Sequence, residues 1–468
     1  MHKCSGFLRK GKRKMKIAVI GGGGVRSMFL AKSLLQHGKE LGFTEIVFMD
    51  NDPVKLDIFG RMSAEVAKRI DPEILFRITG LAEEAIRDAD YIITTIRVGG
   101  DKMRVKDERL ALDLGILGQE TTGAAGFSFA MRSVPALADI CELARIYARP
   151  EVKIFNFTNP AGVVSQTLRD MGYNFTYGIC DAPSGLLRSI ANIYHVDPEH
   201  ITGDCYGLNH LSYFKSIKLD GREVLPELLN KEELYTSSDM RYFGKDLVEE
   251  LHSVLNEYLY YYYYRQEAVD NILKAGSTRG ELICEINRLM IQELSHLDPE
   301  RDFDTCLKVF DKWYGKREDA YMEKETGCVR NRAPYHFDLY EKDDGGYAGV
   351  ALRYIRAVIT GKETEMILCV PNGGAIKELR NDDVVEVTCT IRDGRLVTHP
   401  VDPDPMPMQL IRQVKLYERL ASLAIRTKSR KAALECLMVH PLVNSYSFAK
   451  KLTDEYISSN AAYSSGWL

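Results

Sequence analysis

The sequence predicts an α/β fold that begins with a doubly wound parallel sheet and continues into a second domain of α+β type. Short apolar runs alternate with helix-like stretches through the first 190 residues, and this βαβ alternation is typical of parallel sheets. From about residue 201 the pattern changes to paired strands followed by long helices. We therefore expect a domain boundary near residue 195, which divides the chain into regions 15–195 and 196–468.

Six apolar runs are the expected strands of the first domain, and helical patterns separate nearly all of them. They are KIAVI (16–20), EIVFMD (45–50), ILFRITG (74–80), DYIITTIR (90–97), VKIFNFTN (152–159) and FTYGICD (175–181). In the second domain the dipeptide Asp220-Gly221 predicts a turn between paired strands. Later apolar runs over 365–374 and 384–391 predict further strands, and residues 410–438 predict helix. We assign these late segments to the second domain.

Composition and charge exclude several classes of function. The formal net charge of −4 predicts neither nucleic acid nor an anionic membrane as a partner. The ten cysteines form no CxxC pair, and no apolar run approaches the roughly 20 residues that span a bilayer. We therefore expect a reduced, cytoplasmic compartment. Residues 1–14 are basic and lack a long apolar stretch, so we expect a disordered extension before the first strand.

The first expected strand is followed by GGGGVRS (21–27). Gly21 and Gly23 can form the tight turn and the close backbone approach that a pyrophosphate needs in a Rossmann-type site. The third glycine of that pattern is absent, and an ordinary tight turn is the alternative. Asp50 ends the next strand, where a carboxylate can bind both ribose hydroxyls and repel a 2′-phosphate. This favours NAD over NADP, although a residue of this segment can also cap the following helix.

Two residues are candidate metal ligands. Cys180 lies at the end of a later strand in CDAP (180–183), and His210 follows in GLNHLSYF (207–214). A thiolate and an imidazole can hold a divalent metal and leave positions open for a substrate. A buried core cysteine and a hydrogen-bonded histidine are the alternatives.

Eight segments occur in the order and spacing typical of glycoside hydrolase family 4. They are the glycine loop, IRVGGDKMR, GQETTG, NFTNPAG, CDAP, GLNH, EYLYYYYY and STRGE. The chain resembles this family over nearly its whole length from Met15, and most of all the 6-phospho-glucosidases that use NAD and Mn(II). The resemblance implies an NAD-binding Rossmann domain followed by an α+β substrate, metal and oligomerisation domain like that of lactate and malate dehydrogenases.

The resemblance also implies roles for the metal and substrate ligands. Cys180 and His210 would hold manganese, which would chelate the C2 and C3 oxygens of the sugar and act as a Lewis acid. Arg104, Asn159 and Arg279 match positions that contact the phosphorylated substrate. A guanidinium suits a phosphate because it forms charge-assisted and often bidentate hydrogen bonds. For each arginine, an ordinary surface ion pair is the alternative.

Two further residues match catalytic positions of the family. Tyr258, the first tyrosine of EYLYYYYY, matches the base, and nearby positive charge would have to lower the pKa of its phenol. Packing is the alternative for the whole run, and Tyr261 is the alternative base. Asp181 matches a general acid. The alternatives are a residue that orients the metal ligands without binding the metal, and a helix cap. Glu120 and Glu386 match family glutamates to which we assign no role.

The implied reaction is hydrolysis of a phosphorylated disaccharide or glucoside through temporary oxidation of the sugar. Hydride would pass from C3 to NAD, Tyr258 would remove the C2 proton, and Asp181 would help the C1 oxygen to leave before water and hydride return. The CDAP segment matches the α-glucoside pattern only in part, because Ala182 departs from it, so α and β anomers both stay open. A malate- or lactate-type dehydrogenase and a non-catalytic NAD-binding regulator are the alternatives. We expect a homodimer or homotetramer.

Overall fold

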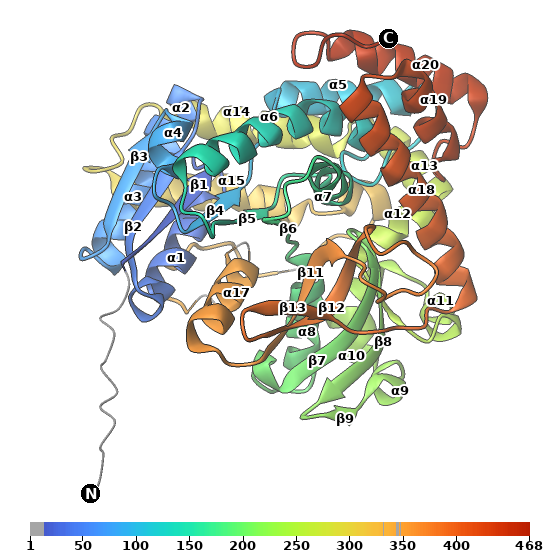
Figure 1. Ribbon diagram of the computed structural model, residues 1–468, viewed down its shortest axis with the longest axis horizontal. Helices are drawn as coiled ribbons and strands as arrows, with labels where there is room; N and C mark the ends of the chain where they lie inside the picture. Colours follow the sequence, from blue (N-terminus) through green and yellow to red (C-terminus); the bar gives the residue numbers. More distant parts are fainter. Residues whose placement is uncertain (1–13, 331, 343–345, 347) are drawn as a thin grey trace, which may run out of the picture.

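The computed structural model describes residues 14–330, 332–342, 346 and 348–468. The extension expected over residues 1–14 therefore lies, except for Lys14, outside the described residues. A nine-stranded sheet runs through the larger part of the molecule (Figure 1) in the order β13-β12-β11-β6-β5-β4-β1-β2-β3. Six strands pair in parallel: β1 (Met15–Ile20), β2 (Phe43–Met49), β3 (Leu75–Thr79), β4 (Tyr91–Thr94), β5 (Lys153–Asn156) and β6 (Thr176–Gly178). All six expected strands are present, and the predicted α/β class is confirmed.

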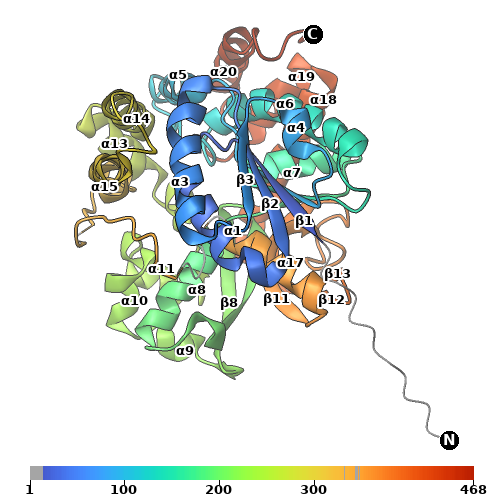
Figure 2. The same cartoon turned by 90° about the vertical axis from the view of Figure 1, so that its left-hand side faces the viewer.

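Helices cover both faces of this parallel sheet, which explains why its strands read as continuous apolar runs. On one face lie α1 (Ser27–Leu41) and α3 (Arg61–Ile70), as Figure 2 shows. On the other face lie α4 (Ala82–Ile86), α6 (Ala125–Tyr147) and α7 (Ala161–Asp170). The two layers bury β1 and β4 completely.

The late strands, which we expected in the second domain, extend this same sheet. β11 (Thr364–Pro371), β12 (Val384–Arg392) and β13 (Arg395–Thr398) add in antiparallel fashion beyond β6. Cys369 of β11 pairs with Gly178 of β6. An apolar run predicts a strand but not its partner, because pairing depends on the open edge that β6 leaves in the folded chain. The division at residue 195 itself stays a prediction.

A second, four-stranded sheet lies beside the late strands. It contains β7 (Ile201–Leu208), β8 (Leu211–Leu219), β9 (Arg222–Glu223) and β10 (Val254–Leu255). Asp220 and Gly221, with φ of 49° and 79°, form the predicted turn between β8 and β9. The hydroxyl of Thr388 in β12 accepts from the Cys205 amide and donates to the Gly203 carbonyl, which ties β7 to the large sheet.

The remaining helices surround the two sheets. They are α2 (Pro53–Lys55), α5 (Gly100–Leu112), α8 (Ala182–Ile193), α9 (Leu225–Leu228), α10 (Glu232–Ser237), α11 (Lys245–Glu250), α12 (Tyr260–Tyr263), α13 (Arg265–Ala275), α14 (Arg279–Leu294), α15 (Phe303–Asp319), α16 (Glu323–Thr326), α17 (Gly349–Thr360), α18 (Pro405–Thr427), α19 (Arg430–Val439) and α20 (Tyr446–Ser459). Helices α18 and α19 span the helical segment expected over 410–438. Among the described residues, no helix combines the length and the apolar character that crossing a membrane requires.

The tyrosine run does not form the long helix that its sequence suggests. Tyr258 lies in a 3₁₀ turn, and α12 ends at Tyr263. Tyr264 then leaves the helical conformation, with φ of −122° and ψ of 38°, before α13 begins. Tyr258 therefore lies in a turn between β10 and α12, and its ring lies beside that of Tyr261, with centroids 5.8 Å apart.

Candidate active site

The glycine loop lies where the direction of the strand order reverses. Strand β1 pairs with β2 on one side and with β4 on the other, and ligands of doubly wound sheets bind at such a switch point. Gly21 has φ of 100°, and a Cβ there would lie 2.5 Å from the carbonyl oxygen of Thr95. A Cβ on Gly23 would lie 2.9 Å from the Asp50 carboxylate. Neither position accepts a side chain, so both positions require glycine.

Asp50 follows β2 and holds the glycine loop. Its Oδ2 accepts from the Gly23 amide at 3.0 Å, and its Oδ1 accepts from the Asp52 amide at 3.0 Å. The cap of α2 is Asp52, which accepts from the amides of Val54 and Lys55 at 3.2 Å and 3.1 Å. The alternative role of Asp50 as the cap is therefore filled by another residue.

One cavity of about 320 Å³ brings together the other seven predicted site residues. These are Arg104, Asn159, Cys180, Asp181, His210, Tyr258 and Arg279. They come from both halves of the chain, since α5, the segments after β5 and β6, the β7–β8 turn and α14 all contribute. Arg26, which ends the glycine loop, also lines this cavity. The end of the glycine loop and the predicted reaction site thus line one cavity.

Cys180 and His210 approach this cavity from two different loops. Cys180 lies between β6 and α8, and His210 occupies the β7–β8 turn with φ of 61°. Burial lowers the pKa of His210 to about 4, so at neutral pH its imidazole is uncharged and able to ligate a metal. Burial raises the pKa of the Cys180 thiol, and the nearby Glu386 carboxyl group contributes to the same shift. Across the part of the chain that the structure describes, no three His, Cys, Asp or Glu side chains are placed to hold a metal together.

Glu386 has a positioning role that the sequence does not reveal. Its Oε1 accepts from the Asn209 amide group at 3.0 Å, and its Oε2 accepts from the Ser212 hydroxyl at 2.7 Å. Both partners belong to the β7–β8 hairpin, on either side of His210. The buried carboxyl group of Glu386 therefore ties the turn that carries His210 to strand β12 of the large sheet.

Tyr258 lies directly against His210. The two rings are stacked, with centroids 3.9 Å apart and an interplanar angle of 5°. Burial raises the pKa of the Tyr258 phenol above its usual value, as does the neighbouring Glu257 carboxyl. Tyr261, the alternative base, also lines the cavity. In the protein alone both phenols are therefore protonated at neutral pH, since burial raises the pKa of Tyr261 as well.

Asp181 precedes α8 but does not cap it. Among the described groups, its side chain accepts no hydrogen bond from the first turn of the helix. The backbone carbonyl of Asp181 instead accepts from the Gly185 amide at 2.7 Å. Asp181 is one of the residues that line the cavity.

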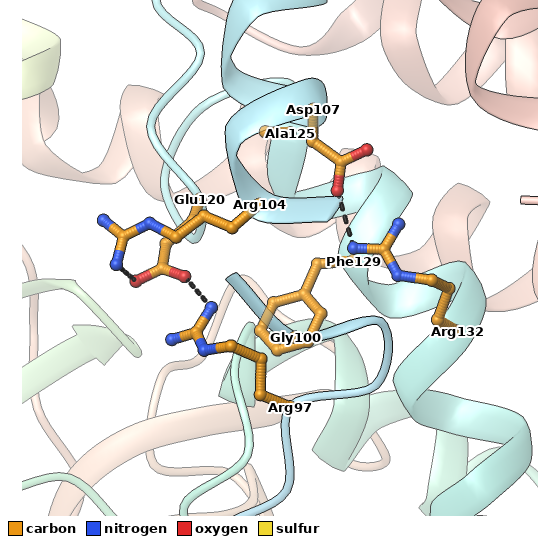
Figure 3. A pocket seen from close by; sticks show the side chains of 8 residues that line it. All are labelled: Arg97, Gly100, Arg104, Asp107, Glu120, Ala125, Phe129 and Arg132. Carbon is orange, nitrogen blue, oxygen red and sulfur yellow. Dashed lines mark hydrogen bonds and ion pairs between the residues drawn. The ribbon is translucent and has the colours of Figure 1, made fainter. Parts of the chain in front are cut away.

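The predicted phosphate ligands differ in their partners. Arg104 binds Glu108 at 2.8 Å and Glu120 at 3.0 Å, and Figure 3 shows Glu120 between Arg104 and Arg97. Burial raises the pKa of Glu120, but the two arginines outweigh burial and lower that pKa to about 2. Arg279 donates to the carbonyl oxygens of Ala320 and Arg317 at 2.6 Å and 2.9 Å. The charge of Arg104 is thus compensated by carboxylates, whereas Arg279 meets only neutral acceptors in these bonds.

Sequence reasoning missed several charged residues of the cavity. Glu257 is buried there, and burial and Asp239 raise the pKa of its carboxyl. Arg317 enters from the last turn of α15, and Arg330 binds Asp239 at 3.0 Å. In the sequence these positions look like solvated charges at helix ends and loops. Only Arg26 carried a usable signal, because it directly follows the glycine loop.

Comparison with known proteins places this geometry among sugar-cleaving enzymes. Residues 16–196 match the model of family 4 glycosyl hydrolases, and residues 205–443 match the model of their C-terminal domain. The 6-phospho-beta-glucosidase BglT of Thermotoga maritima is 29% identical over 453 residues, which cover 96% of this chain and 99% of the relative. The maltose-6'-phosphate glucosidase MalH of Clostridium acetobutylicum is 26% identical over 480 residues, with 96% and 99% covered.

Solved structures agree in fold. The Thermotoga maritima 6-phospho-beta-glucosidase with manganese, NAD⁺ and glucose-6-phosphate is similar with a TM-score of 0.79 at 28% identity, covering 96% of this chain and 99% of that one. A 6-phospho-alpha-glucosidase from gut microorganisms with NAD and glucose-6-phosphate has a TM-score of 0.78 at 25% identity, covering 97% and 99%. Lactate dehydrogenase from Eimeria maxima, at 14% identity and a TM-score of 0.50 over 90% and 98% of the two chains, shares the fold. The predicted likeness to such dehydrogenases is confirmed at that level.

Proposed function

Because this chain belongs to family 4 of the glycosyl hydrolases, we propose that it hydrolyses the glycosidic bond of 6-phospho-glucosides. The reaction uses NAD and a divalent metal, for which Mn(II) is the first candidate. The observation that carries the proposal is the single cavity in which Cys180, His210, Tyr258 and Asp181 meet the residue that ends the glycine loop. Solved relatives with NAD, manganese and glucose-6-phosphate support these three ligands.

The glycine loop fits a dinucleotide. Gly21 and Gly23 leave no room for a Cβ, so backbone amides can approach a pyrophosphate closely. Asp50 already accepts a hydrogen bond from the Gly23 amide, and the same carboxylate can accept from ribose hydroxyls. We assign the binding of NAD to Gly21, Gly23 and Asp50.

The donor set of Cys180 and His210 fits a divalent metal. The imidazole is neutral at physiological pH, and a thiol loses its proton when it ligates a cation. Two protein ligands leave the other coordination positions to the substrate and water. We assign the metal to these two residues.

In the reaction, bound nicotinamide supplies a reversible hydride acceptor for C3 of the sugar, and the metal supplies a Lewis acid. The Tyr258 oxygen would take the proton from C2 as a phenolate, once a cation bound beside it has lowered the pKa of the phenol. The stacked His210 ring holds that side chain at the proposed metal site. Asp181 gives a proton to the glycosidic oxygen as it leaves C1. Arg104, Asn159 and Arg279 orient the phosphorylated sugar. The anomer stays open, because relatives of both the α and the β class match this chain.

The test uses 4-nitrophenyl α- and β-glucoside 6-phosphates and their unphosphorylated counterparts, with NAD and Mn(II) added or withheld. We expect release of nitrophenol only from a phosphorylated substrate and only with both cofactors, without net NADH. Removal of the metal with EDTA should stop the release, and added Mn(II) should restore it. Steady NADH formation from hydroxy acids would instead support a dehydrogenase, and NAD binding without any turnover would support a regulator. A homodimer or homotetramer stays a prediction.

A further inference from the structure

The arginines of the cavity are unevenly matched by carboxylates. Arg97 and Arg104 share Glu120, and Arg330 binds Asp239. Arg279 donates to two backbone carbonyl oxygens, which order the side chain without neutralising its charge. The guanidinium group of a second arginine beside it, Arg317, has fewer partners still.

Arg317 projects into the cavity from the end of α15. Its Nε atom is buried and has no hydrogen-bond partner. Among the residues that the structure describes, no carboxylate forms an ion pair with its guanidinium. Burial and the nearby charges of Arg26 and Arg279 together lower the pKa of Arg317 to about 10, against the opposite effect of Tyr314 and Glu318. Glu318 therefore offsets the positive charge of Arg317 only in part, since burial and the two neighbouring arginines outweigh that carboxylate.

A buried cation without a partner is costly, since desolvation of a charge is repaid only by a close opposite charge. A phosphate monoester would repay it, because its dianion accepts several charge-assisted hydrogen bonds from guanidinium groups. A sugar without the phosphate would leave the charge unmatched. The same feature would therefore provide both affinity and selectivity.

We propose that Arg317 is the specificity-determining residue for the 6-phosphate, and that it binds this group together with Arg279. The proposal rests on the proposed function and refines it. Arg104, already compensated by Glu108 and Glu120, contributes hydrogen bonds but no net charge. Two other anions share the chemistry of the phosphate monoester, namely the pyrophosphate of the dinucleotide and free inorganic phosphate, and the experiment separates them.

The experiment compares R317Q, R317K and the matched control K316Q in the full chain with NAD and Mn(II). Lys316 is exposed on the same helical turn, so K316Q removes an equal charge outside the cavity. We expect R317Q to lose on the order of 100-fold in kcat/KM on the phosphorylated substrate, as for truncation of one partner of a buried charged pair. Its Kd for NAD should not change. R317K should recover part of the loss because it restores the charge, and K316Q should behave as the unchanged protein.

A melting-temperature readout distinguishes binding from a structural role. Removal of the unmatched charge should raise the Tm of R317Q without ligand, while the rise in Tm that glucose 6-phosphate or inorganic phosphate produces should shrink. An unchanged kcat/KM of R317Q on the phosphorylated substrate would overturn the proposal. An equal loss of NAD affinity would also overturn it, because it would assign the arginine to the pyrophosphate. Failure of the proposed function would appear in the unchanged protein, which would cleave no phosphorylated glucoside. The Tm response to inorganic phosphate would still decide whether Arg317 binds an anion.

Discussion

The imidazole of His210 and the phenol of Tyr258 lie parallel, with centroids 3.9 Å apart. This contact links the proposed metal ligand to the proposed base. The β7–β8 turn holds one ring and the 3₁₀ turn before α12 holds the other. Neither ring can tilt without displacing its partner, so the position of the phenol oxygen depends on the same turn that presents the metal ligand.

Tyr258→Phe should keep this stack and lose the hydroxyl. We expect the variant to fold normally, to lose on the order of 100- to 10,000-fold in turnover, and to stop exchange of the C2 proton with solvent. Exchange is measured by NMR after incubation of the substrate in D₂O with NAD and Mn(II). Tyr261→Phe tests the alternative base in the same cavity. Persisting exchange in Tyr258→Phe together with lost exchange in Tyr261→Phe would transfer the role to Tyr261.

Asp181→Asn should show a dependence on the leaving group. An alkoxide needs a proton as it departs, whereas 4-nitrophenolate is stable without one, so the loss of kcat should be larger for a disaccharide phosphate than for the nitrophenyl substrate. The hydrogen bond that the Gly185 amide donates to the Asp181 backbone carbonyl does not involve the Asp181 side chain, so α8 should stay intact. Rates on both substrates give the ratio. Equal losses on the two substrates would contradict the role of general acid.

Asp50→Asn should weaken the preference for NAD over NADP. The substitution keeps a hydrogen-bond acceptor near Gly23 but removes the charge that repels a 2′-phosphate. Asp52→Asn is the matched control, because asparagine also caps helices well and Asp52 binds only the first turn of α2 in the contacts seen here. Kd values for both dinucleotides check the prediction. A similar change in selectivity in both variants would refute the assignment to Asp50.

His440 should make the protein less stable in mild acid. The imidazole is fully buried against Tyr417, its Nδ1 accepts from the Leu442 amide at 3.2 Å, and burial lowers its pKa from 6.5 to about 4. Between these pH values the unfolded chain binds more protons than the folded one, so the free energy of unfolding falls as pH falls from 6.5 towards 4, by about 3 kcal/mol in total.

Urea unfolding at pH 7.5 and pH 5 checks this dependence. His440→Asn can retain an acceptor for the Leu442 amide and should show a smaller difference between the two pH values. His296→Asn changes an exposed imidazole and serves as the control. If His440→Asn and the unchanged protein lose the same stability, another group causes the acid sensitivity.

The elements that sequence reasoning located well are those whose signal is local. Strands such as β1 and β4 are covered on both faces, so each is a continuous apolar run. The β8–β9 turn has an equally local signal, because Asp and Gly tolerate the positive φ that Asp220 and Gly221 adopt. The partner of β11 was not predictable, since strand pairing depends on which edge is open in the folded chain.

The site shows the same division between local and distant signals. The family motifs supplied residues that the structure gathers in one cavity. Arg317 and Glu257 carry no motif, and their burial follows only from the packing of segments distant in sequence. The compensation of Arg104 by Glu120 was likewise hidden, because a pattern of residue types does not show which charges meet.

The pairing of β11 with β6 makes the parallel sheet depend on a segment that the ribosome adds much later. While the intervening helices and the second sheet are being synthesised, the β6 edge is unpaired and can attract other strands. Closing the sheet requires contacts between residues far apart in sequence, and such contacts form slowly. The β6 edge is therefore covered only after Thr364–Pro371 has left the ribosome, and a nascent chain halted before that point should need a chaperone to stay out of aggregates.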